Sequence, residues 1–156
     1  MKHFIIFLIS IPLFAGFPLA SANSKEGDKL LLDNGLVSRV INIADGHVIS
    51  QSYKINTSNV DYLRSPSCDF SFLINEVKYS GRNDWSDISS RDTTASNGGR
   101  GMILSFYDKA RTFKVELSYL TYPDLPLIRK SLDITNISDG ELKVEAVCVE
   151  DLALSF

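Results

Sequence analysis

The sequence predicts an all-β protein built as an antiparallel β-sandwich, and three observations point to that fold class. Apolar and polar residues alternate with a period of two along several short segments, which places one set of side chains inward and the other in water. Turn pairs such as Asp45-Gly46 separate these segments at short intervals. No apolar stripe at helical spacing runs long enough to form a three-turn helix. Many short strands with frequent turns are typical of a sandwich or a barrel.

The first half of the chain contains three segments that we expect to form strands. Residues 36–43 are a β-rich run that follows the turn signal Asp33-Asn34-Gly35, and residues 47–55 alternate loosely. Residues 70–75 place three apolar side chains on one side of a strand, namely Phe70, Phe72 and Ile74.

The second half alternates more regularly. Residues 102–106 form one expected strand, and residues 113–119 give the clearest case, with Phe113, Val115, Leu117 and Tyr119 inward. Residues 128–135 resume the pattern, with Ile128, Leu132 and Ile134 opposite Arg129, Ser131, Asp133 and Thr135. Ser138-Asp139-Gly140 then predicts a hairpin turn into a strand over residues 142–148.

Two polar regions interrupt the strands. Residues 56–69 contain Pro66, and residues 81–101 are rich in Ser, Asp, Asn, Arg and Gly. We expect the second region to be a long loop, for which a binding element and a disordered connector are equally allowed. Residues 149–156 are still strand-like where the sequence stops, so we expect this chain to be the front end of a longer protein, truncated at its C-terminus.

The N-terminus predicts export. Residues 4–20 are an almost unbroken apolar run that follows Lys2 and precedes the small residues Ala20-Ser21-Ala22. This arrangement is typical of a signal peptide spanning residues 1–22, and the run is short for a membrane-spanning helix. We therefore expect a periplasmic or extracellular protein, residues 23–156, with no membrane attachment after cleavage.

Composition excludes several function classes. The chain of 156 residues carries a formal net charge of −3, which lacks the basic footprint of a nucleic-acid binder. No zinc-protease, phosphate-loop, nucleophile-elbow or Cys-x-x-Cys motif occurs, so we assign no metal and no cofactor. Cys68 and Cys148 both remain after export into a compartment that permits disulfides, and a bridge and two separate thiols are equally compatible with the sequence.

Trp85 and its neighbours are the candidate binding residues. An indole ring can pack on the apolar face of a sugar while Asn83 and Asp84 hydrogen-bond its hydroxyls. The alternative is that Trp85 folds back as a lid over the sandwich core. Asp84, Asp87 and Asp92 crowd the same region, where solvated carboxylates are the default because no calcium-loop spacing is present.

Four segments resemble one family. Tyr119–Leu132 (YLTYPDLPLIRKSL), the following Ile134–Asn136, Val149–Leu152 (VEDL) and the opening strand Asn34–Arg39 (NGLVSR) look like the N-terminal β-sandwich of α-galactosidase-like glycoside hydrolases, the melibiase group, family 36 and its relatives. The resemblance is dense over Lys114–Leu152 and thin elsewhere.

The resemblance implies a supersandwich domain that precedes a (β/α)₈ barrel. In such enzymes the barrel supplies the aspartate nucleophile and the aspartate acid/base, in motifs that this sequence does not contain, so no catalytic residue is carried over. We expect a non-catalytic domain of an exported hydrolase acting on α-galactosides, inactive by itself, whose partners are the catalytic barrel, a galactoside-type carbohydrate and a second copy in a homo-oligomer. A stand-alone carbohydrate-binding sandwich and a structural or oligomerisation module are the alternatives.

Overall fold

The computed structural model describes residues 23–58 and 60–154 and confirms the all-β prediction. Its strands, in chain order, are β1 (Ser24–Glu26), β2 (Lys29–Asp33), β3 (Val37–Asn42), β4 (Ile49–Ile55), β5 (Val60–Asp61), β6 (Ser67–Cys68), β7 (Ser71–Ile74), β8 (Val77–Ser80), β9 (Ser86–Thr94), β10 (Arg100–Tyr107), β11 (Phe113–Tyr122), β12 (Leu125–Asn136) and β13 (Val144–Cys148). One short 3₁₀ turn, η1 (Ala44–Gly46), lies between β3 and β4. Every strand pair is antiparallel.

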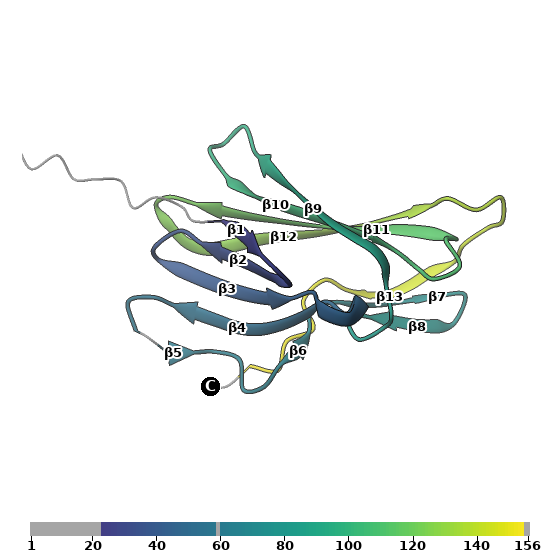
Figure 1. Ribbon diagram of the computed structural model, residues 1–156, viewed down its shortest axis with the longest axis horizontal. Helices are drawn as coiled ribbons and strands as arrows, with labels where there is room; N and C mark the ends of the chain where they lie inside the picture. Colours follow the sequence, from purple (N-terminus) through teal and green to yellow (C-terminus); the bar gives the residue numbers. More distant parts are fainter. Residues whose placement is uncertain (1–22, 59, 155–156) are drawn as a thin grey trace, which may run out of the picture.

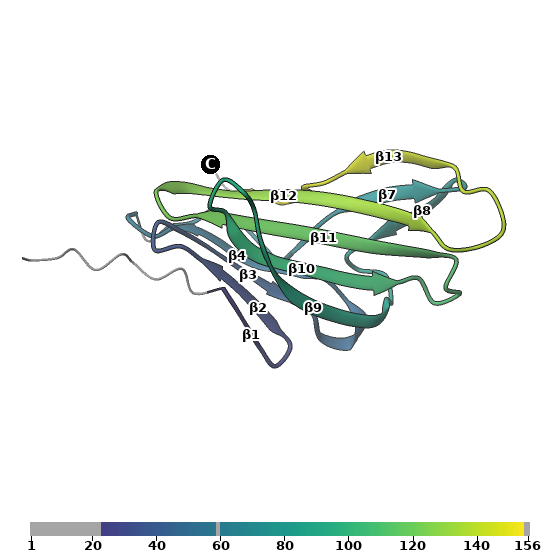
Figure 2. The same ribbon diagram turned by 90° about the horizontal axis from the view of Figure 1, so that it is seen from above.

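The strands form two facing layers. One layer is a four-stranded sheet in the order β12-β11-β10-β9. The other layer consists of a sheet in the order β1-β2-β3-β4-β5, with β6 also paired to β4, and a three-stranded sheet in the order β13-β7-β8. Figure 1 shows the two layers from the side, and Figure 2 shows the four-stranded sheet from above, with β12 along one margin.

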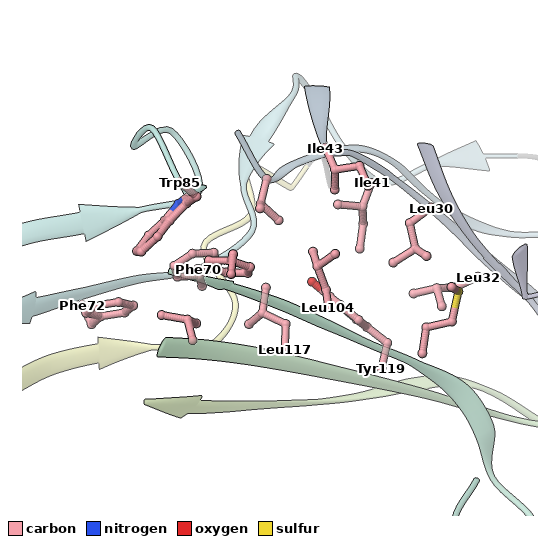
Figure 3. Packing of buried hydrophobic residues seen from close by; sticks show 14 of the residues in the cluster. Leu30, Leu32, Ile41, Ile43, Phe70, Phe72, Trp85, Leu104, Leu117 and Tyr119 are labelled. Atoms are coloured by element: carbon pink, nitrogen blue, oxygen red, sulfur yellow. The ribbon is translucent and has the colours of Figure 1, made fainter. Parts of the chain in front are cut away.

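Alternating sequence produces the buried interior. In β11 the odd-numbered residues from Phe113 to Tyr119 are all buried, whereas Lys114, Glu116 and Ser118 are only partly covered, as a period of two requires. The same residues pack against Leu30, Leu32 and Ile41 of the facing layer, and against Phe72 of β7 and Phe70 just before it (Figure 3). All three sheets therefore contribute to one hydrophobic core.

The structure differs from the sequence prediction of one long loop over residues 81–101. Nine of its residues form β9, the end strand of the four-stranded sheet, paired with β10 from Arg100↔Thr94 to Tyr107↔Ser86. Because β9 has only one neighbour in the sheet and carries short polar side chains, its alternation consists of partly covered and exposed positions, with no buried residue. A strand of that kind has little hydrophobic pattern for the sequence to display.

The region after β12 differs from the prediction as well. Ser138-Asp139-Gly140 does not close a hairpin, since β13 pairs with β7 in the other layer (Val144↔Ile74) and not with β12. The described part of the last segment, residues 149–154, contains no strand and has one isolated bridge, Leu63↔Leu154. The predicted signal peptide, residues 1–22, lies outside the described residues. Among those that are described, no helix is long and apolar enough to cross a membrane.

Candidate functional site

The most unusual feature of the interior is a group of four charged side chains and one tyrosine, which we call the ion cluster. It consists of Arg39 on β3, Asp69 just before β7, Tyr119 on β11, Lys130 on β12 and Glu150 after β13. Arg39 is 1% exposed and Asp69 is fully buried. Charged residues are almost never buried to this extent unless they are paired.

Asp69 lies at the centre of the ion cluster. Its Oδ1 atom is 2.6 Å from Arg39 Nη2 and accepts a hydrogen bond from Ser50 Oγ at 2.6 Å. Its Oδ2 atom accepts from the Tyr119 hydroxyl and pairs with the ammonium group of Lys130. Both carboxylate oxygens therefore have partners on different strands, which satisfies a charge that would otherwise be very costly to bury.

Glu150 completes the ion cluster from the last described segment. Arg39 donates to it through both terminal nitrogens, Nη1 to Oε1 at 2.8 Å and Nη2 to Oε2 at 2.9 Å. This two-point geometry is the strong form of an arginine–carboxylate pair. The side chain of Glu150 is 41% exposed, unlike its partners, so the ion cluster reaches solvent only on this side.

The pKa values follow from these contacts. Burial by itself raises the pKa of Asp69, but Arg39 and Lys130 outweigh it and hold the value at about 2. Burial lowers the pKa of Lys130, and Asp69 only partly opposes that shift. Burial also raises the pKa of Tyr119 well above its usual value, and the charge of Asp69 adds to the effect. Around neutral pH the cluster therefore contains an ionised Asp69 and a neutral Tyr119.

This arrangement is suited to holding segments together and unsuited to proton transfer. A general acid or base needs a pKa near the working pH and must reach the substrate. Asp69 has neither property, since its pKa is about 2 and it has no exposed surface. The adjoining cavity of about 340 Å³ is reached by Glu150 and Tyr53 and is otherwise lined by Arg39, Ile128, Leu152 and Leu154.

Sequence reasoning missed the ion cluster, although a signal was present. Arg39 occupies an inward position between Val37 and Ile41, all three of which are buried. Lys130 likewise shares the inward side of β12 with Ile128 and Leu132. A charged residue in the inward register of an alternating strand predicts a buried ion pair, because isolated charges are excluded from such positions.

The sequence-predicted residues Asn83, Asp84 and Trp85 come together on one surface cavity of about 300 Å³. The cavity is also lined by Tyr79, Asp108, Lys109 and Ala110. Trp85 itself is only 5% exposed, and Figure 3 shows its indole ring directed into the core beside Phe70. The ring centroid is 4.8 Å from that of Phe106, and its N–H donates to the carbonyl of Ser80 at 3.0 Å. The alternative in which Trp85 covers the core is therefore the one observed.

The nearby carboxylates are partnered. Asp84 lies 2.6 Å from Lys109 Nζ and 3.4 Å from His47 Nε2, and the bond from Lys109 lowers its pKa. Asp87 pairs with Arg111. Within residues 23–58 and 60–154, no group of three or more His, Cys, Asp and Glu side chains could hold a metal ion.

Cys68 and Cys148 are free thiols in the structure, so the disulfide considered from sequence is not formed there. Both are partly buried, and the Cys148 thiol donates to the carbonyl of Glu150 at 3.1 Å.

Three comparisons with known proteins return no match for this chain: one with protein-family models, one with curated proteins and one with solved structures. The function is therefore argued from the residues and their geometry.

Proposed function

We propose that this chain is a non-catalytic β-sandwich domain of an exported α-galactosidase-like glycoside hydrolase, whose catalytic barrel is a separate part of the protein. The proposal starts from the resemblance of four sequence segments to the N-terminal sandwich of that family. One observation supports it: three of these segments, which are far apart in the sequence, meet in the folded chain.

The ion cluster is the meeting point. Arg39 ends the opening segment Asn34–Arg39, Tyr119 and Lys130 belong to Tyr119–Leu132, and Glu150 belongs to Val149–Leu152. Their charged or hydroxyl groups interact within a single network around Asp69. Residues from three of the resembling segments therefore interact around Asp69, which itself lies outside them, and this shared contact supports the proposal.

A second contact joins two of these segments, Asn34–Arg39 and Tyr119–Leu132. The side-chain amide of Asn34 donates to the carbonyl of Tyr122 at 2.6 Å and to that of Leu125 at 2.8 Å. Its Oδ1 atom accepts from the backbone N–H of Val37 at 2.9 Å. Asn34 is buried and therefore fixes the turn between β11 and β12 against the start of β3.

Three carboxylates, those of Asp69, Asp84 and Asp87, are each engaged in an ion pair, which supports a non-catalytic role. Glycoside hydrolysis uses two carboxyl groups that face each other across the bound sugar. Asp69 is neutralised inside the core, and Asp84 and Asp87 are paired with Lys109 and Arg111 at the surface. We infer that this domain supports the active-site mouth and leaves the chemistry to the barrel.

The test begins with the gene. We expect the reading frame after the Phe156 codon to continue into alternating strand and helix patterns with aspartates at strand ends. The encoded protein should hydrolyse an aryl α-galactoside with retention of configuration, whereas the 156-residue chain should not. A stop codon at that position, or turnover by the short chain itself, would overturn the proposal.

A stand-alone sugar-binding role is the second candidate, favoured by the shared cavity of Asn83, Asp84 and Trp85. Trp85 is the single tryptophan, so its fluorescence should change as galactose, melibiose or raffinose fills the cavity. Asp84→Ala should abolish that change, and Asp92→Ala, outside the cavity, should preserve it. A flat response in the native protein removes this candidate.

A further inference from the structure

Strand β12 is an open sheet edge. Within the described residues it pairs with β11 alone, from Phe113↔Asn136 to Tyr122↔Leu125, and it is the end strand of its sheet. It spans Leu125–Asn136, 12 residues, longer than any other described strand. Long unpaired edges readily add another strand, so proteins usually shorten, cover or pair them.

The layer beneath β12 extends further than β12 does. Figure 2 shows β13 beyond the margin of the four-stranded sheet. Val144 of β13 is directly opposite Ile74 of β7, and opposite residues of an antiparallel pair point to the same face. Ile74 is 4% exposed in the core, yet Val144 on that same face is 43% exposed. Val144 belongs to β13, the end strand of its sheet, and no described strand of the facing sheet lies beyond β12 (Figure 2).

We propose that the missing strand is β12 of a second copy of this chain, paired antiparallel about a two-fold axis at Ser131. The β12 sequence is self-complementary in this register. Arg129 of one copy lies opposite Asp133 of the other, and Ile128 lies opposite Ile134. Opposite-charge pairs of this kind stabilise neighbouring antiparallel strands, and each is made twice by symmetry.

The two charges are available for this contact. Arg129 and Asp133 are exposed, and neither makes an ion pair with another described residue. Lys130, between them, points inward and is held by Asp69 with its side chain 2% exposed, so it places no free charge in the interface. This dimer does not depend on the hydrolase assignment, since it follows from β12 and β13 alone.

Charge reversal tests the register directly. The full chain should sediment as a monomer–dimer equilibrium across about a hundredfold range of concentration. Arg129→Asp and Asp133→Arg should each raise the dimer dissociation constant about tenfold or more, because each places like charges opposite one another twice. The double variant R129D/D133R regenerates both pairs with opposite polarity and should restore the native value.

Controls separate this register from general charge effects. Lys78→Asp makes the same change of charge as Arg129→Asp on the exposed strand β8 and should leave the dimer unchanged. Circular dichroism of each variant checks that it is folded. A native chain that stays monomeric at every concentration, single variants that dimerise normally, or a double variant that is not rescued would each contradict the proposal.

Discussion

The aromatic part of the core and the ion cluster adjoin one another, and the consecutive residues Asp69 and Phe70 belong one to each. Phe70 stacks on Phe72 at 5.7 Å and on Phe106 at 5.7 Å, and Trp85 and Phe113 pack around them. Asp69 is surrounded instead by Arg39, Lys130 and Tyr119. Both regions are buried, but their stabilities have different origins.

Aromatic packing depends on area and shape, and it weakens gradually when a ring is changed. The contribution of a buried ion pair to stability depends on the balance between the cost of desolvating its charges and the attraction between them. Taking the charges out of water costs several kcal/mol per ion, and this cost is recovered only while every partner is present. Substitutions of similar size should therefore lower the free energy of unfolding by different amounts in the two regions. The following experiments measure this difference.

The largest effect should come from Asp69→Asn. The substitution keeps the shape of the side chain but removes the charge that neutralises Arg39 and Lys130. We expect a loss of about 3–5 kcal/mol in the free energy of unfolding, because Lys130 loses its close counter-ion and Arg39 keeps only the partly exposed Glu150. Urea denaturation measures this loss, with the exposed Asp124→Asn as the matched control. A loss below about 1 kcal/mol would show that the charge does not organise the cluster.

Acid should act on the ion cluster and leave the aromatic region alone. The pKa of Asp69 is lowered in the folded state to about 2, so its stabilisation is complete above its unfolded pKa. It is lost as pH falls from about 4 through about 2, and the loss should approach about 2 kcal/mol. Urea denaturation across this range measures it, and any folded Asp69→Asn variant should have a smaller slope. An equal slope in both proteins would assign the acid sensitivity to other carboxylates.

Phe106→Leu should lower the free energy of unfolding by less than Asp69→Asn or acid does. Phe106 packs on Phe70 and Trp85, and leucine retains most of the apolar contact while leaving a small void. We expect a loss of about 1–2 kcal/mol with no change in acid sensitivity. Thermal unfolding at several pH values measures both the loss of stability and its dependence on pH. If this variant lost as much stability as Asp69→Asn, the proposed contrast between the two regions would be wrong.

The smallest effect should come from Glu150→Gln, at the solvent side of the cluster. Its partial exposure limits the loss of global stability to below about 1 kcal/mol. The local effect should be larger, because Glu150 anchors residues 149–154. The amides of Asp151 and Ala153, bonded to Asp69 O and Ser67 Oγ, should exchange with deuterium faster. Glu145→Gln, whose salt bridge is to Lys143 at the surface, should leave their exchange unchanged.

The alternation of β11 is sufficient to predict a strand with one buried face. A strand covered by a facing layer has a strong contrast between the residues that point inward and those that point outward. The same rule failed for β9, where an edge position and polar side chains leave no buried residue to mark the strand. It also failed for the partner of β13, since Ser138-Asp139-Gly140 resembles a hairpin turn but leads into the other layer. Turn chemistry describes only a few residues and does not specify which strand lies next.

For the candidate binding residues as well, one part of the arrangement could be predicted from the sequence and another part could not. Asn83, Asp84 and Trp85 are adjacent in sequence, so their common cavity required little from the tertiary structure. The direction of the Trp85 ring, however, is decided by its packing on Phe70 and Phe106, which come from other parts of the chain. Its function as a core residue therefore could not be derived from its polar neighbours.

Local alternation is enough to predict the all-β class and the inward faces of β7, β10 and β11, because a period of two is a local property of the chain. The mutual neutralisation of Arg39, Asp69, Lys130 and Glu150 becomes visible in the folded chain alone, since Arg39 and Glu150 are 111 residues apart. Coulomb interactions act through space, and the low dielectric of the interior makes such distant pairings either strongly favourable or prohibitive. The layered fold alone brings these charges within bonding distance.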